Sequence, residues 1–86
     1  MYRLYVGANN KTKRVEINKI ERFLNSHTDG YTIIPARGYW QGQREPSVVI
    51  EMQVTKRQAI VIATGLKGVL KQEAIGICKA TALNFI

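Results

Sequence analysis

The sequence predicts an α+β fold of the ferredoxin-like type, with the element order βαββαβ, a four-stranded antiparallel sheet and two helices on one face. Two observations predict it. Apolar residues alternate with polar ones in strand-like segments and recur every three or four positions in helix-like segments. These segments follow one another as strand, helix, strand, strand, helix, strand. At 86 residues, the chain is expected to form one domain, residues 1–86, with one small core.

The first strand and the first helix fill the N-terminal part of the chain. In Tyr2–Val6, an apolar set alternates with Arg3 and Tyr5, which predicts a half-buried strand. A turn follows, and then a basic loop that contains Lys11, Lys13 and Arg14. The spacing predicts a helix at Val15–Ser26. Its buried stripe is formed by Ile17, Ile20, Phe23 and Leu24.

Two strands joined by a hairpin are expected next. The second strand is Tyr31–Trp40, and Pro35 places it at a sheet edge or at a bulge because proline cannot donate a ladder hydrogen bond. The hairpin tip is expected at Gln41–Pro46. The third strand is expected at Ser47–Val54. Its apolar face consists of Val48, Ile50, Met52 and Val54.

The second helix is predicted from a capping box with Thr55 as N-cap and Gln58 reaching back, and it is expected to run to about Gln72. Its buried stripe consists of Ala59, Ile62, Ala63, Leu66, Val69 and Leu70. Gly65 and Gly68 each weaken a helix by about 1 kcal/mol relative to alanine. We therefore expect them to permit the close approach of a neighbouring element.

The last strand is expected at Ile75–Phe85. One of its faces is unusually small and suits close packing, with Gly76, Cys78, Ala80 and Ala82. Cys78 is expected to be a small buried residue, and His27 an exposed residue at a helix end. One cysteine and one histidine exclude an intrachain disulfide, a cysteine-rich zinc site and a paired nucleophile and histidine. No metal and no cofactor are expected.

The chain is strongly basic. Thirteen Lys and Arg against six Asp and Glu give a net charge of +7, which favours anionic partners such as nucleic acid, nucleotides or acidic proteins. The uncharged runs are much shorter than the roughly 20 residues that span a bilayer. The N-terminus enters a strand pattern directly, without the apolar core of a signal peptide. We expect a cytoplasmic protein without membrane contact.

The predicted architecture leaves one sheet face without a helix. Such a face must be polar, bind a ligand or be buried by another subunit. Tyr5 and Val49 lie opposite the main apolar sets of their strands. At most one of Tyr39 and Trp40 faces the helices, because neighbours on a strand point to opposite faces. Self-association is the preferred interpretation, while scattered surface residues and a nucleic-acid stacking face stay open.

A nucleic-acid-binding module is the third function considered. The segment Arg3–Gly7 resembles the first-strand motif of RNA-recognition modules, in which an aromatic residue stacks on a base. The expected third strand has no aromatic residue and places Glu51 on the open side, so half of that pattern is present. The basic residues that would contact nucleic acid are Lys11, Lys13, Arg14, Lys56, Arg57, Lys67 and Lys71.

Residues suited to ligand binding gather around the hairpin. Glycine lets the backbone approach a ligand, arginine offers forked donors to phosphate or carboxylate, and tryptophan offers a face to a base or a cation. The candidate ligand-binding residues are Arg37, Gly38, Tyr39, Trp40, Gly42, Gln43, Arg44 and Glu45. The alternative is a hairpin in which Trp40 and Glu45 set the turn and an interface.

These motifs resemble those of the PII-like and CutA-like superfamily, whose members are ferredoxin-like and usually trimeric. The aromatic, Trp-x-Gly and Glu positions of that hairpin correspond to Tyr39, Trp40, Gly42 and Glu45. The sequence is more closely similar to a family of short uncharacterised bacterial and phage proteins. The segments that it shares with that family are Tyr5–Gly7, Gly30–Thr32, Gly38–Trp40 and Arg44–Ser47.

The resemblance implies a homotrimer whose sheets pack inward, with clefts between subunits that hold a nucleotide or another adenosine-containing molecule. It implies a sensor or a sequestering protein, and no catalytic residue is assigned. A more distant similarity, to phage S-adenosylmethionine lyases, implies an enzyme as the alternative. In that case Tyr39 and Glu45 would be the catalytic residues.

Overall fold

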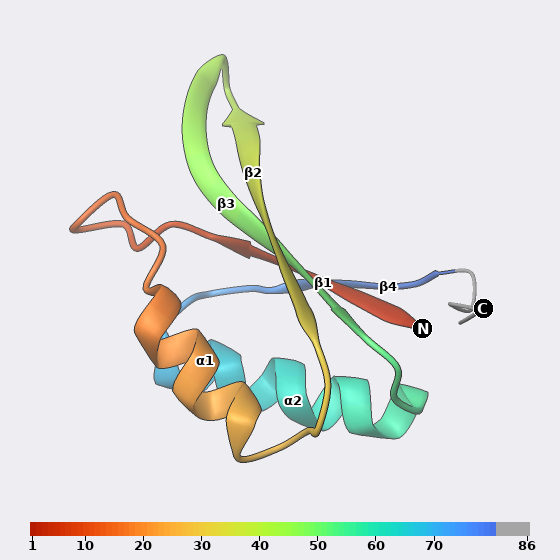
Figure 1. Ribbon diagram of the computed structural model, residues 1–86. Helices are drawn as coiled ribbons and strands as arrows, with labels where there is room; N and C mark the ends of the chain where they lie inside the picture. Colours follow the sequence, from red (N-terminus) through yellow and green to blue (C-terminus); the bar gives the residue numbers. More distant parts are fainter. Residues whose placement is uncertain (81–86) are drawn as a thin grey trace.

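The computed structural model describes residues 1–80, apart from the side chain of Trp40. Its strands are β1 (Tyr2–Gly7), β2 (Thr32–Trp40), β3 (Gln43–Met52) and β4 (Gly76–Lys79), and its helices are α1 (Ile17–Asn25) and α2 (Lys56–Val69). The strands form one antiparallel sheet in the order β2-β3-β1-β4, and both helices cover the same face (Figure 1). The predicted ferredoxin-like α+β fold is confirmed.

The core lies between the helices and the central strands β1 and β3. Alternate residues of these strands point toward the helices, so Leu4 and Ile50, which are directly paired, are both fully buried. The buried apolar residues are Leu4, Val6, Ile20, Leu24, Val48, Ile50, Met52, Ala59, Ile62, Leu66 and Leu70. The predicted stripes of the strands and helices are therefore largely the observed core.

The second helix begins and ends with specific caps. The capping box is confirmed, because Gln58 N–H donates to Thr55 Oγ1 over 3.1 Å and Thr55 N–H donates to Gln58 Oε1 over 2.9 Å. The helix stops at Val69, earlier than predicted. Lys71 takes a left-handed φ of 53°, and Gln72 N–H donates to the Lys67 carbonyl over 3.0 Å, as in a Schellman motif.

Two expectations for this helix were wrong. Val69 is 42% exposed rather than buried, since it lies on the last turn, facing away from the sheet. Gly68 has no heavy atom within 4 Å of where a Cβ would stand, so it permits no close approach. Gly65 does, because its missing Cβ makes room for the ring of Phe23 on α1.

The hairpin between β2 and β3 is tighter than predicted. Only Gln41 and Gly42 form the turn, and both have positive φ, 51° and 77°. Gln43–Pro46, expected in the tip, continues β3 instead. Pro46 is compatible with this because it lies just beyond the last pair between β1 and β3, Gly7 opposite Ser47. Pro35 lies on β2, which is confirmed as an edge strand.

The other boundaries differ from expectation at the two ends of the sheet. α1 begins at Ile17 rather than Val15, and Glu16, at its N-cap, makes no capping hydrogen bond. β4 covers only part of the strand expected at Ile75–Phe85, and residues 81–86, with Ala82, lie outside the described residues. Cys78 is exposed, so the expectation of a buried thiol was wrong.

Candidate functional site

The hairpin projects past the sheet. β2 and β3 stay paired from Thr32–Glu51 to Trp40–Gln43, whereas β1 ends opposite Ser47. The outer parts of the two strands therefore form a two-stranded extension, visible as the long curved arm in Figure 1. We call this extension, residues 37–40 with residues 43–46, the hairpin ribbon.

The hairpin ribbon separates its candidate residues onto two faces. Tyr39 pairs with Arg44, and Gly38 pairs with Glu45. Directly paired residues share a face and neighbours alternate, so Tyr39 and Glu45 point to opposite faces. A Cβ at Gly38 would lie 3.8 Å from Ser47 Oγ, which confirms that the alternation continues along this stretch. A single subunit therefore does not bring Tyr39 and Glu45 together as a catalytic pair.

The residues of each face have different surroundings. Arg37, Tyr39 and Arg44 lie on the face that continues the helix-covered side of the sheet, and all three are exposed. Gln43 and Glu45 lie on the opposite face and are also exposed. Glu45 also borders a cleft.

That cleft lies at the base of the hairpin ribbon and has a volume of about 620 Å³. Its walls come from the β1–α1 loop, the start of α1, Glu45 of β3 and the α2–β4 loop. We call it the hairpin-base cleft. The charged residues that line it are Lys11, Glu16, Lys19, Glu45, Lys71 and Glu73. Gln72 Nε2 donates to the Gly7 carbonyl over 2.7 Å and joins two of these walls.

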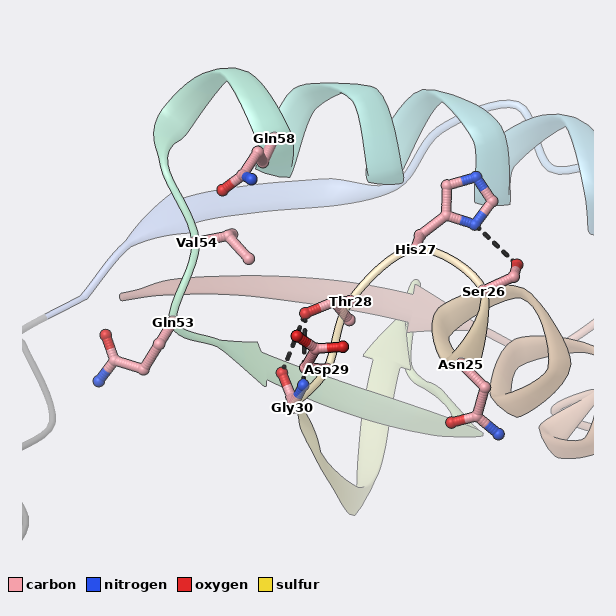
Figure 2. A pocket seen from close by; sticks show the side chains of 9 residues that line it. All are labelled: Asn25, Ser26, His27, Thr28, Asp29, Gly30, Gln53, Val54 and Gln58. Carbon is pink, nitrogen blue, oxygen red and sulfur yellow. Dashed lines mark hydrogen bonds between the residues drawn. The ribbon is translucent and has the colours of Figure 1, made fainter.

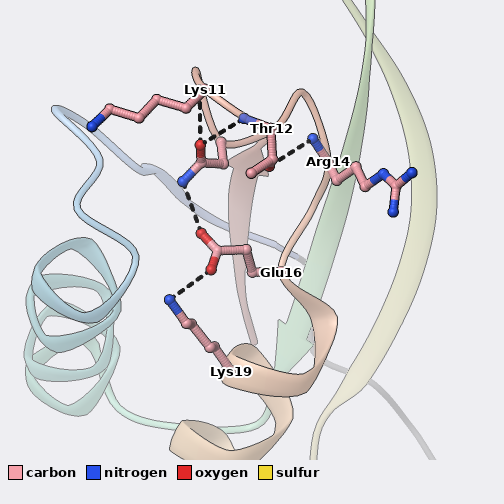
Figure 3. A network of polar contacts seen from close by, with 6 residues as sticks. Lys11, Thr12, Arg14, Glu16 and Lys19 are labelled. Carbon is pink, nitrogen blue, oxygen red and sulfur yellow. Dashed lines mark hydrogen bonds and ion pairs between the residues drawn. The ribbon is translucent and has the colours of Figure 1, made fainter.

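Asn9 organises the wall formed by the β1–α1 loop. Its Oδ1 accepts from the backbone N–H of Lys11 over 2.8 Å and of Thr12 over 3.1 Å, and its Nδ2 donates to Glu16 Oε1 over 3.0 Å. Glu16 Oε2 also forms an ion pair with Lys19 Nζ at 2.7 Å (Figure 3). The Lys19 and Asn9 hydrogen bonds lower the pKa of the Glu16 carboxyl.

This network settles which charges in the cleft are available to a ligand. Glu16 and Lys19 neutralise one another, while Lys11 extends away from Glu16 in Figure 3. Lys11 and Lys71 are exposed cations at opposite walls, and Glu45 and Glu73 are exposed carboxylates. The cleft thus offers donors to an anionic group together with acceptors for an amine or a hydroxyl group.

Sequence reasoning missed most of this cleft. From the sequence, Asn9 has no role beyond the turn after the first strand, and Lys71 is only a candidate contact for nucleic acid. One available signal was the pairing of an Asn-rich turn after a strand with a Glu at the start of a helix. The left-handed backbone of Lys71 could not be predicted from the sequence, because the residue that usually takes this conformation after a helix is glycine.

The open face, defined as the sheet face without helices, carries an apolar row across all four strands. Ile34, Val49, Tyr5 and Gly76 stand side by side in the strand register. Tyr5 is 48% and Ile34 40% exposed. A Cβ at Gly76 would lie 3.3 Å from Tyr5 Cβ, which confirms close packing at that small residue.

A polar row flanks the apolar one on the open face. Arg3 Nε donates to Glu51 Oε2 over 2.6 Å, and this ion pair raises the pKa of Arg3. Cys78 stands opposite Arg3 in the register, which explains its exposure: it lies on the open face, away from the core.

A second hollow lies at the other end of the sheet, around the α1–β2 turn, with a volume of about 510 Å³ (Figure 2). His27 lines it and is exposed, as expected. Its ring stacks on Phe23 with centroids 3.9 Å apart, and its Nδ1 lies 2.8 Å from the Phe23 carbonyl. His27 thus has a local packing role, and the hollow offers few charged groups.

Metal and membrane sites were also considered. Among residues 1–80, no three His, Cys, Asp or Glu side chains gather in a way that could hold a metal ion. No helix in this part of the chain is long and apolar enough to cross a bilayer.

Comparisons with known proteins bear on the fold. No protein-family model matches the chain, and no curated protein matches it in sequence. A DUF3240 family protein from Shewanella baltica is 13% identical with a TM-score of 0.69, over 99% of this chain and 93% of that one. CutA from Archaeoglobus fulgidus, described as a periplasmic divalent cation tolerance protein, is 14% identical with a TM-score of 0.60, over 100% and 88%.

CutA1 from Pyrococcus horikoshii is a further match, 13% identical with a TM-score of 0.55, over 98% of this chain and 87% of that one. This chain has the CutA-like fold. The likeness extends over almost the whole length, so the predicted resemblance to the PII-like and CutA-like superfamily is confirmed for the fold. None of these three proteins is described as an S-adenosylmethionine lyase.

Proposed function

We propose that this chain is a homotrimeric binding protein for a small anionic or adenosine-containing molecule of the nucleotide type, acting as a sensor or a sequestering protein. The observation that carries the proposal is the hairpin-base cleft. It places Glu45, at the start of a projecting ribbon, beside Lys11 and Lys71 from two loops that are remote in sequence. A mixed set of exposed cations and carboxylates suits a ligand with both an anionic group and nucleoside-like donors.

Assembly is supported by the open face. Three apolar side chains stand in one row there without a helix to cover them: Tyr5, Ile34 and Val49. Burying such a row against copies of itself gains about 25 cal/mol for each Å² of apolar surface removed from water. A closed, symmetric ring satisfies every copy equally, which favours a cyclic homo-oligomer.

Assembly would also complete the site. Arg37, Tyr39 and Arg44 are exposed outside their own subunit's hairpin-base cleft. They reach a ligand only if the hairpin ribbon lies against a neighbouring subunit. The candidate residues Gly38, Trp40 and Gln43 belong to the same ribbon and Gly42 to the turn at its tip, and they would help to shape that shared cleft.

The test is a thermal-shift panel with ATP, AMP, S-adenosylmethionine and inorganic phosphate. A ligand at about 100 times its Kd stabilises the folded state by about 2.7 kcal/mol, so the Tm should rise by several degrees. Lys71→Asn keeps a residue that tolerates left-handed backbone and removes the charge, so it should reduce the shift. Lys67→Gln, on the exposed side of α2, is the matched control and should not. The absence of a shift with every compound would contradict the proposal.

A further inference from the structure

The hairpin end of the molecule carries most of the unpaired positive charge. The ion pairs among the described residues are Arg3–Glu51 and Lys19–Glu16. Neither uses the cations that gather at this end, which are Lys11, Lys13, Arg14, Arg37, Arg44 and Lys71. The carboxylates there that lack an ion pair are Glu45 and Glu73. This end of the molecule therefore has a net positive charge.

An exposed aromatic side chain stands within this charge. Tyr39 is 68% exposed, more than any other large apolar or aromatic side chain of the described residues. It is directly opposite Arg44, and Arg37 is two residues away on the same face of the hairpin ribbon. Side chains in these relations have Cβ atoms about 5 to 7 Å apart. The face therefore presents an aromatic ring next to two arginine side chains.

The neighbouring loop presents its cations from a fixed backbone. Asn9 Oδ1 holds the N–H groups of Lys11 and Thr12, and the Lys13 N–H donates to the Asn9 carbonyl over 2.8 Å. Arg14 extends away from Glu16 (Figure 3), so that carboxylate does not neutralise it. Lys11 and Glu45 line the same cleft, which places this loop at the base of the hairpin ribbon on the side of Glu45, opposite Tyr39. The cations of the loop therefore add to the charge of this end without belonging to the Tyr39 face.

We propose that the Tyr39 face of the hairpin ribbon is a docking surface for single-stranded nucleic acid. The cations contact phosphates, and the Tyr39 ring stacks on an unpaired base. Arg37 and Arg44 lie on an exposed arm rather than in a cavity, which fits an extended polyanion better than a small anion. An exposed ring favours a single strand, because the bases of a duplex are already stacked on one another. Arg37, Tyr39 and Arg44 also belong to the shared cleft of the proposed function, so an oligonucleotide and the small ligand would compete for this surface.

The experiment is fluorescence anisotropy of the full chain with labelled oligouridylate and oligothymidylate of about 15 nucleotides, at several salt concentrations. Each phosphate contact contributes about −0.7 to the slope of log affinity against log salt. Replacing Arg37 and Arg44 by Gln should therefore reduce the slope by about 1.4. The matched control replaces Lys56 and Arg57 by Gln at the start of α2, at the far end of β3 from the hairpin ribbon, and should change it little.

Stacking is tested separately from charge. Tyr39→Leu should weaken binding about tenfold, whereas Tyr39→Phe should keep most of the affinity. If oligouridylate binds more tightly than oligothymidylate, the preferred partner is RNA, and the reverse order indicates DNA. Equal losses in the ribbon and control pairs would overturn the proposal in favour of unspecific charge attraction. Poly-glutamate binding as tightly as the oligonucleotides, without sensitivity to Tyr39→Leu, would overturn it in favour of an acidic protein partner.

Discussion

Gly65 of α2 stands against the ring of Phe23 of α1: a Cβ added at position 65 would come within 2.9 Å of Phe23 Cε2 and closer still to Cζ. One face of the Phe23 ring is stacked on His27, with centroids 3.9 Å apart. The ring therefore has little room to withdraw. The absence of a side chain at Gly65 lets the two helices pack closely over the sheet.

We predict that Gly65→Ala lowers the free energy of unfolding by about 1 kcal/mol, because overpacking outweighs the gain in helix propensity. Gly68→Ala, three residues along the same helix with open space at its Cβ position, should raise it by up to about 1 kcal/mol. Urea unfolding at one fixed protein concentration measures both. If both substitutions raised the free energy of unfolding, the close packing of the Phe23 ring against Gly65 would be contradicted.

The Asn9–Glu16 contact predicts a pH dependence of the loop. Hydrogen bonds from Lys19 and Asn9 lower the pKa of Glu16 below its ordinary value of 4.5. A lowered folded-state pKa means that the contact stabilises fully above the unfolded-state pKa, and the stabilisation is lost as the pH falls through the folded value. Asn9→Ala should raise the pKa of Glu16 toward its ordinary value.

A carboxyl carbon NMR titration of Glu16 measures this shift. Asn10→Ala, at the exposed neighbouring asparagine, is the matched control and should leave the titration of Glu16 as it is in the unmodified protein. The network in Figure 3 would be wrong if both substitutions moved the midpoint equally, or if neither moved it.

The tip of the hairpin ribbon predicts a local change in dynamics. Gly42 has a φ of 77°, where a residue with a Cβ is disfavoured by about 1–2 kcal/mol. Gly42→Ala should therefore increase the opening of the ribbon about tenfold, seen as faster amide hydrogen exchange near Gln43. Gln41→Asn, which creates the Asn-Gly pair favoured in such turns, should slow the same exchange.

Gly38→Ala is the control for that experiment. Its Cβ would meet Ser47 Oγ at an ordinary contact distance of 3.8 Å, so exchange at the tip should not change. Exchange that is the same in the Gly42→Ala and unmodified proteins would contradict a two-residue turn with positive φ.

The fold could be predicted from local sequence patterns because tertiary packing favours the same elements as those patterns. Leu4 and Ile50 alternate with polar neighbours and are paired in the core, and Thr55 and Gln58 form the cap that their spacing predicts. Boundaries were harder where the backbone departs from its usual residue preferences. Lys71 ends α2 in a left-handed conformation that is usual for glycine, and Pro46 lies inside β3 because β1 has already ended.

The candidate site was less accessible to sequence reasoning. Arg37, Tyr39 and Glu45 cluster in the sequence, yet strand alternation places Tyr39 and Glu45 on opposite faces. The hairpin-base cleft draws on Lys11 and Lys71, sixty residues apart, which no local pattern connects. Cys78 was expected to be buried by residue type, but its register opposite Arg3 places it on the open face.

The proposed assembly predicts that a charge in the middle of the open face separates the subunits. Val49 stands between Ile34 and Tyr5, so Val49→Glu would place a carboxylate in the buried interface without a partner. The variant should elute as a monomer with an unchanged circular dichroism spectrum. Val61→Glu makes the same change at a residue of α2 that is 59% exposed, and should keep the assembly. Dissociation of both variants, or of neither, would count against the open face as the interface.

Sedimentation equilibrium of the unmodified chain tests the central claim most directly. Three chains of 9.7 kDa should sediment together as a particle of about 29 kDa at micromolar concentration. A single species of 9.7 kDa over the same range would contradict the trimer and the shared clefts that depend on it.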